Sequence, residues 1–504
     1  MKKRHHETVV RKRIMLGAAL TLLLGLPFAL ANRAFANPTP KFAYVANEGG
    51  DNTVSAYTIN SSTGALRAVP GSPPATGKDP FAVTVDPMGR FVYVANSGAN
   101  TVSAYTINSS TGTLSAVPGS PFAAGNTPFS VTVDPSGQFA YVANNGQSGE
   151  STVSAYTIDH STGALRAVAG SPFAAGHFPD SVTVDPSGRF AYVSNQCLFS
   201  GCSVGNVSAY TIDSSTGALR EVAGSPFPAG DTPRSVAVDP SGQFAYVASR
   251  GGNVSAYTVN SSTGALRPVA GSPFAAGTDP VSMTVDPSGR FAYVANQCNP
   301  SDCQKGNVSA YTINTSTGAL RAVSGSPFAA GYIPDSVAVD PSGQFAYVVN
   351  GCGSSRDCSA GNVSAYIINS STGGLRAASG SPFAAGIASS SVAIAGQAIT
   401  SSVLTLSPRS LAFGNLPINT SSAAQSVTVT NTSAKAVAIK GIALRGTDPG
   451  QFAFTDDCGK SLAAYATCTL EAKFRPTTEG AKTAFLDVNG GGEGRSVKLT
   501  GTGT

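Results

Sequence analysis

The chain has 504 residues, of which 12% are charged, and its 32 Lys and Arg against 27 Asp and Glu give a formal net charge of +5. The first 36 residues carry seven of the basic side chains and one acidic one, so the remainder holds 25 positive and 26 negative side chains. A nearly neutral chain without a basic run excludes nucleic acid as a partner.

Residues 1–36 have the order of a secretory signal peptide. A basic start precedes the apolar run IMLGAALTLLLGLPFAL, and Ala34-Phe35-Ala36 forms a small-x-small cleavage site. The alternative is an uncleaved anchor, but a run of 17 residues that contains Pro27 is at the short end for a spanning helix. We therefore expect cleavage after residue 36 and no transmembrane segment afterwards. The protein is expected in the periplasm, at the cell surface or outside the cell.

From residue 37 onward one phrase recurs at intervals of 47 to 54 residues. Its first phenylalanine recurs at seven positions: Phe42, Phe91, Phe139, Phe190, Phe244, Phe291 and Phe345. A period near 50 indicates a solenoid or a propeller. In SVTVDPSGQFAYVAN (130–144) two β-rich runs flank a type I turn, and in TVSAYTINSSTGALRAV (53–69) two more flank Asn-Ser-Ser-Thr-Gly. Four short strands without helical periodicity predict a propeller blade.

We name the four strands of a unit A, B, C and D in chain order; in one unit they are expected near residues 130–133, 139–144, 152–158 and 164–168. The first unit begins with strand B, and the last segment, SVAIAG at 391–396, is a lone strand A. The two ends of the repeat region can therefore share one blade and close the ring. The prediction is an all-β chain with a seven-bladed β-propeller over residues 37–397.

The phrase YVAN…TVSAYTI…TGAL…GSPF…VTVDPSG.FAYV, over about residues 39–397, resembles the seven-bladed lactonase family. That family includes the propeller type of 6-phosphogluconolactonase and is similar to the YVTN repeat proteins. The resemblance implies a propeller whose central channel, in the family's enzymes, uses histidine, carboxylate and arginine. A full family motif is not matched by the candidate residues named below.

Eight cysteines form four close pairs, which in an exported chain predict disulfides: Cys197/Cys202, Cys298/Cys303, Cys352/Cys358 and Cys458/Cys468. The alternative is a metal site, but four or five residues intervene in the first three pairs and no histidine accompanies them. We expect no metal and no cofactor. The first three pairs fall between strands B and C, so the predicted disulfides would stiffen loops on one rim, or merely protect those loops from proteolysis.

The repeat is absent from residues 398–504. This segment contains about seven short strand patterns with turn signals between them, which predict an immunoglobulin-like β-sandwich. The segment resembles Hydin-like and choice-of-anchor D modules through FGNLP, VTNT, the Cys458/Cys468 pair, FRP at 474–476 and the closing LTGTG. The resemblance implies an adaptor or cell-surface module.

The B–C and D–A loops of every blade lie on the same rim, so variable residues beside them are candidates for a site at the channel mouth. Two residues before the first apolar core residue of strand A, the repeats carry Phe81, Phe129, Asp180, Arg234, Val281, Asp335 and Ser390. Strand B ends in a nearly constant asparagine, but in one blade Ser249 and then Arg250 follow instead. We therefore predict a cluster of Asp180, Arg234, Arg250 and His177 as catalytic candidates. Further binding candidates are Asp335, Asn195, Asn296 and Asn350.

Three functional hypotheses follow. The first is an exported binding or scaffold protein that holds an unknown protein or small-molecule ligand at the channel mouth. The alternative is a lactonase in which the arginines hold an anionic substrate and stabilise the oxyanion while Asp180 or His177 activates water. The same cluster could also be an ordinary ion pair at the rim, which would suit a third hypothesis, a structural or adhesive surface protein.

Overall fold

The computed structural model describes residues 40–504, except residues 51, 72–73, 147–150, 197–203, 299–304, 355–357, 397–403, 409, 432–435, 464–465 and 491–492. The predicted signal peptide lies outside the described residues, as do Cys197, Cys202, Cys303 and the side chain of Cys298. Within the described part, a three-residue 3-10 helix is the one helical element, and all other elements are strands. No helix in the described part of the chain is long and apolar enough to cross a membrane.

One blade shows how the repeat folds. Strands β9 (Pro128–Val133), β10 (Phe139–Asn144), β11 (Thr152–Ile158) and β12 (Leu165–Ala167) pair antiparallel in that order, and the two-residue strand β13 (Phe173–Ala174) also pairs with β11. In the A–B turn Asp134 accepts hydrogen bonds from the backbone N–H groups of Ser136 (3.0 Å) and Phe139 (2.7 Å). The aspartate of each V-D-P turn is thus a turn residue.

The remaining blades repeat this arrangement. Strands A are β4 (Pro80–Val85), β14 (Pro179–Val184), β19 (Pro233–Val238), β24 (Thr278–Val285), β28 (Phe328–Val339) and β33 (Ser389–Gly396). Strands B are β1 (Pro40–Asn47), β5 (Phe91–Asn96), β15 (Phe190–Asn195), β20 (Phe244–Ser249), β25 (Phe291–Cys298) and β29 (Phe345–Cys352). Strands C are β2 (Thr53–Ile59), β6 (Thr101–Ile107), β16 (Asn206–Ile212), β21 (Asn253–Val259), β26 (Lys305–Ile313) and β30 (Asn362–Ile368).

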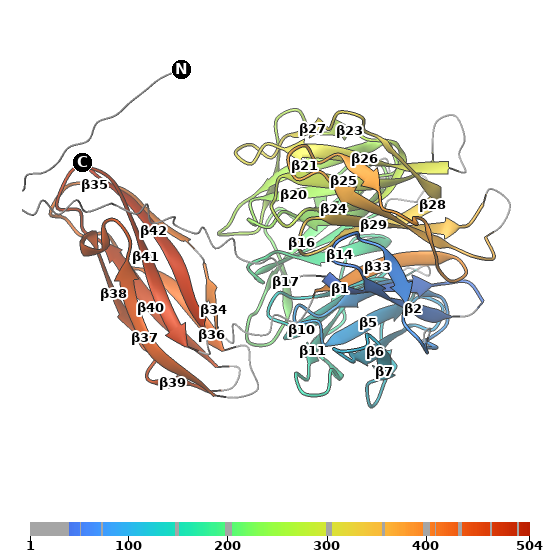
Figure 1. Ribbon diagram of the computed structural model, residues 1–504, viewed down its shortest axis with the longest axis horizontal. Coiled ribbons are helices and arrows are strands. Elements are labelled where there is room, and N and C mark those ends of the chain that lie inside the picture. The colour runs from blue at the N-terminus through green and yellow to red at the C-terminus, as the bar shows by residue number, and fades with distance from the viewer. Residues whose placement is uncertain are drawn as a thin grey trace, which may run out of the picture. The chain divides into compact units, whose positions relative to one another are not determined.

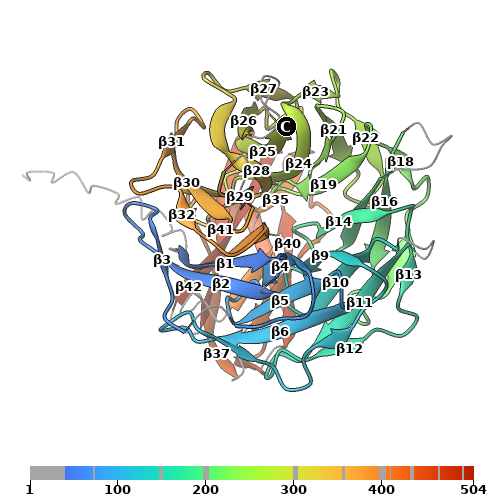
Figure 2. The ribbon, with the colours of Figure 1, turned by 90° about the vertical axis from the view of Figure 1, so that its right-hand side faces the viewer.

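The outer strands are short. Strands D are β3 (Leu66–Ala68), β7 (Leu114–Ala116), β17 (Leu219–Glu221), β22 (Leu266–Pro268), β27 (Leu320–Ala322) and β31 (Leu375–Ala377). Further two-residue strands are β8 (Phe122–Ala123), β18 (Phe227–Pro228), β23 (Phe274–Ala275) and β32 (Phe383–Ala384). Figure 2 shows strands A nearest the centre of the ring and strands D at its periphery.

The ring is closed by strands from both ends of the repeat region. Strand β33, the lone strand A, pairs antiparallel with β1, with Val392 opposite Val45, and completes the blade of β1, β2 and β3. Successive strands A contact one another around the channel, including β33 with β4. The seven-bladed propeller predicted from the repeat is therefore confirmed.

Blades pack on one another through strands that are apolar on both faces. Strand β5 is buried along its whole length, and Phe91 and Tyr93 pack against Ala140 and Tyr156 of the following blade. The Tyr93 hydroxyl donates to the Gly163 carbonyl at 3.0 Å, and Gly163 has a positive φ of 79° with no room for a side chain beside the Phe91 ring. The same bond closes the ring, since Tyr347 donates to the Gly64 carbonyl at 3.0 Å.

The C-terminal domain is a sandwich of two sheets (Figure 1). The first sheet has the order β34 (Leu404–Ser407), β36 (Gln425–Asn431), β40 (Thr467–Phe474) and β38 (Phe452–Asp456). The second has the order β35 (Ser410–Leu416), β42 (Glu493–Gly503), β41 (Gly480–Gly490), β37 (Val437–Arg445) and β39 (Ser461–Leu462), with β35 parallel to β42. A short 3-10 helix, η1 (Pro449–Gln451), precedes β38.

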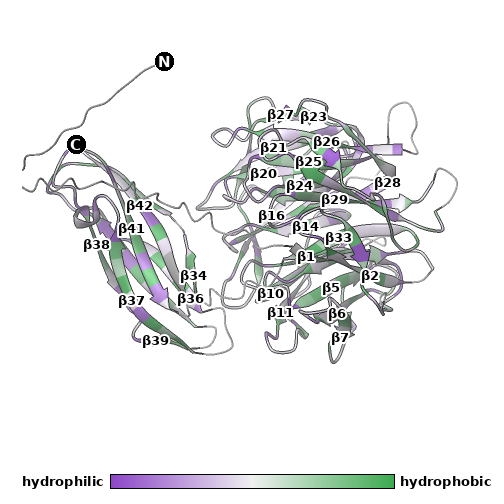
Figure 3. Cartoon of the chain, in the orientation of Figure 1, coloured by the Kyte–Doolittle hydropathy of each residue, from purple (hydrophilic) through white to green (hydrophobic). Residues whose placement is uncertain are grey.

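Sandwich strands alternate between buried and exposed side chains. Along β40 the buried residues Cys468, Leu470, Ala472 and Phe474 face the core, and Figure 3 shows apolar and polar residues alternating on these strands. This period of two is the pattern of a sheet with one face on a core. The predicted β-sandwich is confirmed.

Candidate functional site at the channel mouth

A pocket of about 170 Å³ lies within the ring of strands A. Each blade contributes to its wall the residue that the repeat phase marked as variable: Phe81, Phe129, Asp180, Arg234, Val281, Asp335 and Ser390. The next residue of each strand also lines it, and in six of the seven blades this is a serine. Glu48, from the loop after β1, completes the lining.

A β-bulge turns each of the seven variable side chains into the pocket. In the blade of β9 and β10, Asn144 pairs with Pro128 and Ala143 with Ser130, so Phe129 has no partner in the ladder. The same register shift leaves out Asp180, Arg234 and Asp335 in their blades. Bulges re-aim side chains and are frequent beside active sites. The backbone two residues earlier is strained, with positive φ at Asp79, Thr127, Phe178, Thr232, Asp279, Ile333 and Ala388.

The serines below the bulges join neighbouring blades. The Ser130 hydroxyl accepts the N–H of Val182 at 3.2 Å, and the Ser235 hydroxyl accepts that of Met283 at 3.1 Å. In the blade of β4 the position is Ala82, so no hydroxyl is offered to the next blade there. These serines therefore have a structural role. They link adjacent strands A directly beside the bulged residues that line the pocket.

One side of the pocket is aromatic. Phe81 and Phe129, from adjacent blades, stack with ring centroids 4.4 Å apart and planes 16° from parallel. Both rings are half-buried, so they present apolar surface to the pocket. Contact between stacked rings is favourable and holds the two rings in one orientation.

The next two blades carry a buried ion pair. Arg234 Nη1 lies 3.0 Å from Asp180 Oδ1, and the two side chains are 15% and 6% exposed. The Gln196 amide Nε2 donates to the same carboxylate oxygen. Burial raises the pKa of Asp180, while Arg234, Gln196 and Arg250 oppose the shift. The Arg234 Nε has no hydrogen-bond partner, so this guanidinium keeps an unused donor.

Two members of the predicted cluster do not line the pocket. Arg250 pairs with Asp279, not with Asp180: its Nε is 2.9 Å from Asp279 Oδ1, and its side chain is 43% exposed. His177 is exposed in the connection between β13 and β14 and does not line the pocket. The structure thus brings Asp180 and Arg234 together, keeps Arg250 beside them in a second ion pair, and leaves His177 outside. Both arginines have a carboxylate partner, but Arg234 lines the pocket and Arg250 does not.

Asp335 is half-buried in the pocket wall on β28 and faces a second glutamine. The Gln297 amide Nε2 donates to Asp335 Oδ1. Burial raises the pKa of Asp335 to about 7, and the charge of Glu48 adds to this, whereas Gln297, Arg234 and Arg250 oppose it. Burial and the charge of Asp79 likewise raise the pKa of Glu48. Carboxyl groups therefore contribute less negative charge here than they would in water.

The three asparagines proposed as binding residues do not line the pocket. Asn195, Asn296 and Asn350 are fully buried at the ends of strands B. Asn195, for example, donates to Asn206 Oδ1 (2.8 Å) and Ser208 Oγ (2.9 Å) on strand C. These side chains hold strands B and C together, which explains why the repeats retain them.

Sequence reasoning missed Glu48, Gln196 and Gln297, although one signal could have found them. All three occupy the position directly after the strand-B asparagine, as does Arg250 after Ser249. Across the seven repeats this position reads Glu48, Ser97, Asn145, Gln196, Arg250, Gln297 and Gly351. The variable residue, not the constant asparagine before it, carries the polar group that reaches the channel mouth.

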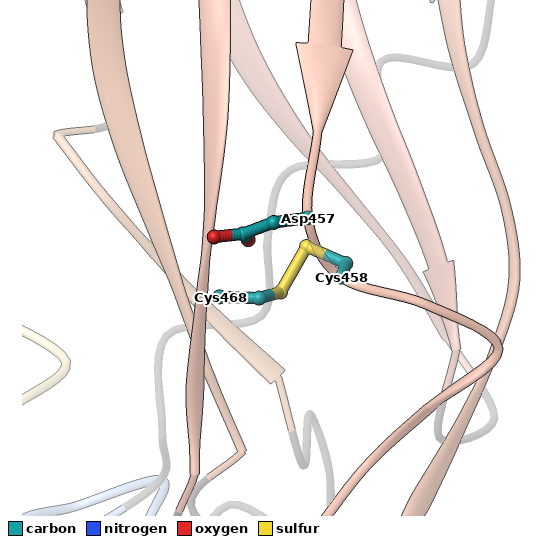
Figure 4. A group of neighbouring side chains, drawn as sticks. All are labelled: Asp457, Cys458 and Cys468. Atoms are coloured by element: carbon teal, nitrogen blue, oxygen red, sulfur yellow. A yellow bond between two sulfur atoms is a disulfide. The ribbon is translucent and has the colours of Figure 1, made fainter.

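Two predicted disulfides fall within the described residues and both are formed: Cys352–Cys358 and Cys458–Cys468. Asp457 lies beside the second, and these three residues form the one group of potential metal ligands found in the described part of the chain. Figure 4 shows the two sulfur atoms bonded to each other. The group is therefore a disulfide with a neighbouring carboxylate, since a bonded sulfur is no thiolate ligand.

The family model for "Lactonase, 7-bladed beta-propeller" matches residues 33–178, 150–277 and 207–388. A second model, "Abnormal spindle-like microcephaly-assoc'd, ASPM-SPD-2-Hydin", matches residues 402–496. The chain belongs to the seven-bladed lactonase family and carries a C-terminal domain of the ASPM-SPD-2-Hydin type. Both resemblances seen in the sequence are thereby confirmed. No curated protein matches the chain.

Solved structures share the propeller fold at low sequence identity. A "putative 6-phosphogluconolactonase" from Bacteroides uniformis is 17% identical with a TM-score of 0.58, over 71% of this chain and 99% of that one. Its counterpart from Bacteroides fragilis is 19% identical with a TM-score of 0.56, over 71% and 98%. The periplasmic gluconolactonase of Pseudomonas aeruginosa is 18% identical with a TM-score of 0.55, over 70% and 99%. At these identities the comparison shows the fold alone.

Proposed function

We propose that this protein works outside the cytoplasm and binds an uncharged, hydroxylated ring, a sugar or a sugar lactone, at the channel mouth. The two-sided pocket carries the proposal: stacked Phe81 and Phe129 face a wall that contains Asp180, Arg234 and Asp335. Aromatic rings offer apolar contact area, and carboxylates and guanidinium groups bond to hydroxyls and carbonyls. A sugar ring has an apolar face and a polar edge, which match the two walls.

The charges of the pocket favour an uncharged ligand. The Arg234–Asp180 pair in the pocket wall and the Arg250–Asp279 pair outside it each combine one cation with one acid. The other titratable side chains that line the pocket are the acids Glu48 and Asp335. A phosphate or carboxylate would meet no unpaired cation there and would face negative charge. A volume of about 170 Å³ lies below the roughly 300 Å³ of sites for drug-sized ligands, so it suits a single ring.

Export is supported by the basic-apolar start of the sequence and by the disulfides. One solved propeller of the same fold is described as periplasmic. Domain boundaries near residues 36 and 397 fit this proposal, since β1 begins at Pro40 and β33 ends at Gly396. Secretion with cleavage after residue 36 is checked by the mass of the protein recovered from its native host.

Hydrolysis of the bound lactone is the second candidate function. A specific observation favours it over simple binding: Asp335 and Arg234, an acid with a pKa of about 7 and a cation, line the same small pocket. Ester hydrolysis needs a proton acceptor for water and positive charge at the developing oxyanion. A purely structural or adhesive role would require neither group to face the channel.

Calorimetric titration tests the binding proposal. We expect heat of binding for glucono-δ-lactone or D-glucose, and at least tenfold weaker binding of 6-phosphogluconate. Phe81→Leu should weaken binding of the uncharged ligand several-fold, because it removes an aromatic face while keeping apolar volume. Phe122→Leu, in β8 of the same blade but outside the pocket, is the matched control and should bind normally. Preference for the phosphorylated ligand, or equal binding by both variants, would contradict the proposal.

A further inference from the structure

We propose that Asp335 is the catalytic proton acceptor of this pocket and that Gln297, anchored by Arg250, is its positioning residue. The inference rests on the proposed function, and on the second candidate, hydrolysis, in particular. It replaces Asp180 and His177, which the sequence had suggested for this role.

The Asp180 carboxylate already has two hydrogen-bond partners. Its Oδ1 accepts from both Gln196 and Arg234, and its side chain is 6% exposed. Protonation of Asp180 would break its buried ion pair, and Asp180 is less exposed than Asp335. Asp180 therefore serves as the counter-ion of Arg234 and holds the guanidinium against the pocket.

Asp335 occupies the same bulge position three strands A further round the ring, but its surroundings differ. In the blade of Asp180 the residue after the strand-B asparagine is Gln196, which reaches the aspartate of its own blade. In the blade of Asp335 that residue is Gly351, and a side-chain carbon placed there would lie 2.9 Å from Asp335 Oδ2. Position 351 thus offers no side chain that could bond to Asp335 as Gln196 bonds to Asp180. Asp335 lines the pocket, so we place the reacting water at Oδ2 on the pocket side.

The other carboxylate oxygen is held from the neighbouring blade. Gln297 Nε2 donates to Asp335 Oδ1, and Gln297 Oε1 faces Arg250 Nη2 at 3.5 Å. Arg250 is in turn held by Asp279. The chain Asp279–Arg250–Gln297 sets the direction of the glutamine amide, so that its NH₂ group and not its oxygen meets Asp335. Gln297 therefore fixes Asp335 with Oδ2 available to the pocket.

The charged groups around Asp335 set its pKa near neutral pH, so that it can exchange a proton there. Arg234 on β19 and Arg250 after β20 favour the carboxylate, while Glu48 after β1 and burial disfavour it. Tyr332 is on β28, the strand that carries Asp335, and the Lys305 Nζ on β26 lies 5.7 Å from the centre of its ring. The balance places the pKa of Asp335 at about 7. A proton acceptor is most effective when its pKa lies near the working pH.

The step balances with water as the only co-reactant. Water oxygen attacks the lactone carbonyl carbon, Asp335 Oδ2 takes one water proton, and the carbonyl π electrons move to the oxygen beside the Arg234 guanidinium. The tetrahedral intermediate then collapses, the bond from the carbonyl carbon to the ring oxygen breaks, and that oxygen takes the proton from Asp335. The product is the open hydroxy acid, and Asp335 is a carboxylate again.

The test measures kcat/KM for glucono-δ-lactone against pH, with buffer hydrolysis subtracted. For the wild type we expect activity to rise with pH through a limb near 7, since Asp335 must be deprotonated. Asp335→Asn should lower kcat/KM by roughly 10²- to 10⁴-fold. Gln297→Leu should move the limb to higher pH, because loss of the amide donor disfavours the carboxylate, while much of the high-pH rate remains. Gln196→Leu, at the equivalent position beside Asp180, is the matched control and should not move the limb.

The outcomes separate this inference from the function on which it rests. Circular dichroism and titration with D-glucose establish that each variant is folded with an intact pocket. Binding without wild-type hydrolysis of any uncharged lactone would overturn the inference and leave the binding proposal standing. Wild-type hydrolysis that Asp335→Asn retains within about threefold, or a limb that Gln297→Leu does not move, would overturn the assigned roles and leave hydrolysis standing.

Discussion

At the residue scale, seven equivalent side chains enter one small pocket and differ only in type. The backbone supplies the same bulge and the same strained residue two positions earlier in each blade, whether the bulged residue is Phe129, Asp180 or Ser390. Function can therefore change by substitution at single positions without refolding a blade. This separation of constant frame and variable residue is what makes an asymmetric site possible in a nearly symmetric ring.

The pKa of Asp335 predicts how stability depends on pH. Its pKa is about 7 in the folded protein and near 4 in the unfolded chain, so its stabilising contribution is fully present below pH ~4 and is lost as pH rises through 7. Asp335→Asn removes this loss and still accepts the Gln297 donor. We expect the variant to gain about 1–2 kcal/mol over the wild type at pH 8 and nothing at pH 4. Denaturant unfolding at both pH values measures the difference, and an equal effect at both would contradict it.

The phase of the repeat was enough to predict which residues face the channel mouth, because a residue's place in one blade gives its place in all. The repeat did not predict which acidic residue each arginine pairs with. Arg250 follows β20 and pairs with Asp279 at the start of β24, in the next blade, and such a contact between blades leaves no local sequence signal. Asn195 and Asn296, which precede the two glutamines, are constant in the repeats and structural, whereas the position after them varies and carries Gln196 and Gln297.

At the element scale, the C–D turns join each blade to its predecessor. Gly163 sits against the Phe91 ring in a left-handed conformation, and its carbonyl takes the Tyr93 hydroxyl bond. The strand order and the turns followed from sequence patterns, since Asp-Pro-Ser-Gly and Asn-Ser-Ser-Thr-Gly specify turns locally. The contact of each turn with the previous blade could not be predicted, because a tertiary neighbour leaves no local signal.

Two glycine substitutions separate backbone strain from crowding. Gly71→Ala introduces a side chain at φ +78° with no atom within 4 Å, so we expect a loss of about 1 kcal/mol from strain alone. Gly163→Ala has a similar φ, but its side chain would meet the Phe91 ring, and we expect a further loss of about 2–3 kcal/mol from overpacking. Chemical denaturation compares them. Equal losses would show that the Phe91 ring can move aside.

At the scale of the whole molecule, the propeller depends on one non-covalent closure. Strand β33, from the C-terminal end of the repeat region, is the innermost strand of the blade formed by β1, β2 and β3 from the N-terminal end. It also contributes Ser390 and Ser391 to the pocket wall. Closure and site are therefore linked, since loss of this strand opens the ring and removes part of the pocket.

Two truncations test this closure. A chain that ends at residue 388 lacks β33 and exposes the edge of β1, so we expect aggregation and no cooperative thermal transition. A chain that ends at residue 401 lacks only the C-terminal domain and should keep the propeller's transition and its ligand binding. Size-exclusion chromatography and thermal circular dichroism distinguish the two. Unfolding of both, or of neither, would contradict the role given to β33.

The most direct test of the whole account is a crystal structure of the protein soaked with an uncharged sugar such as D-glucose. We predict density for one ring between the phenyl groups of Phe81 and Phe129 and the polar wall, with a hydroxyl group at Asp335. Density for the sugar elsewhere, with the channel mouth unoccupied at a ligand concentration that saturates binding in solution, would contradict the central claim that this pocket is the functional site.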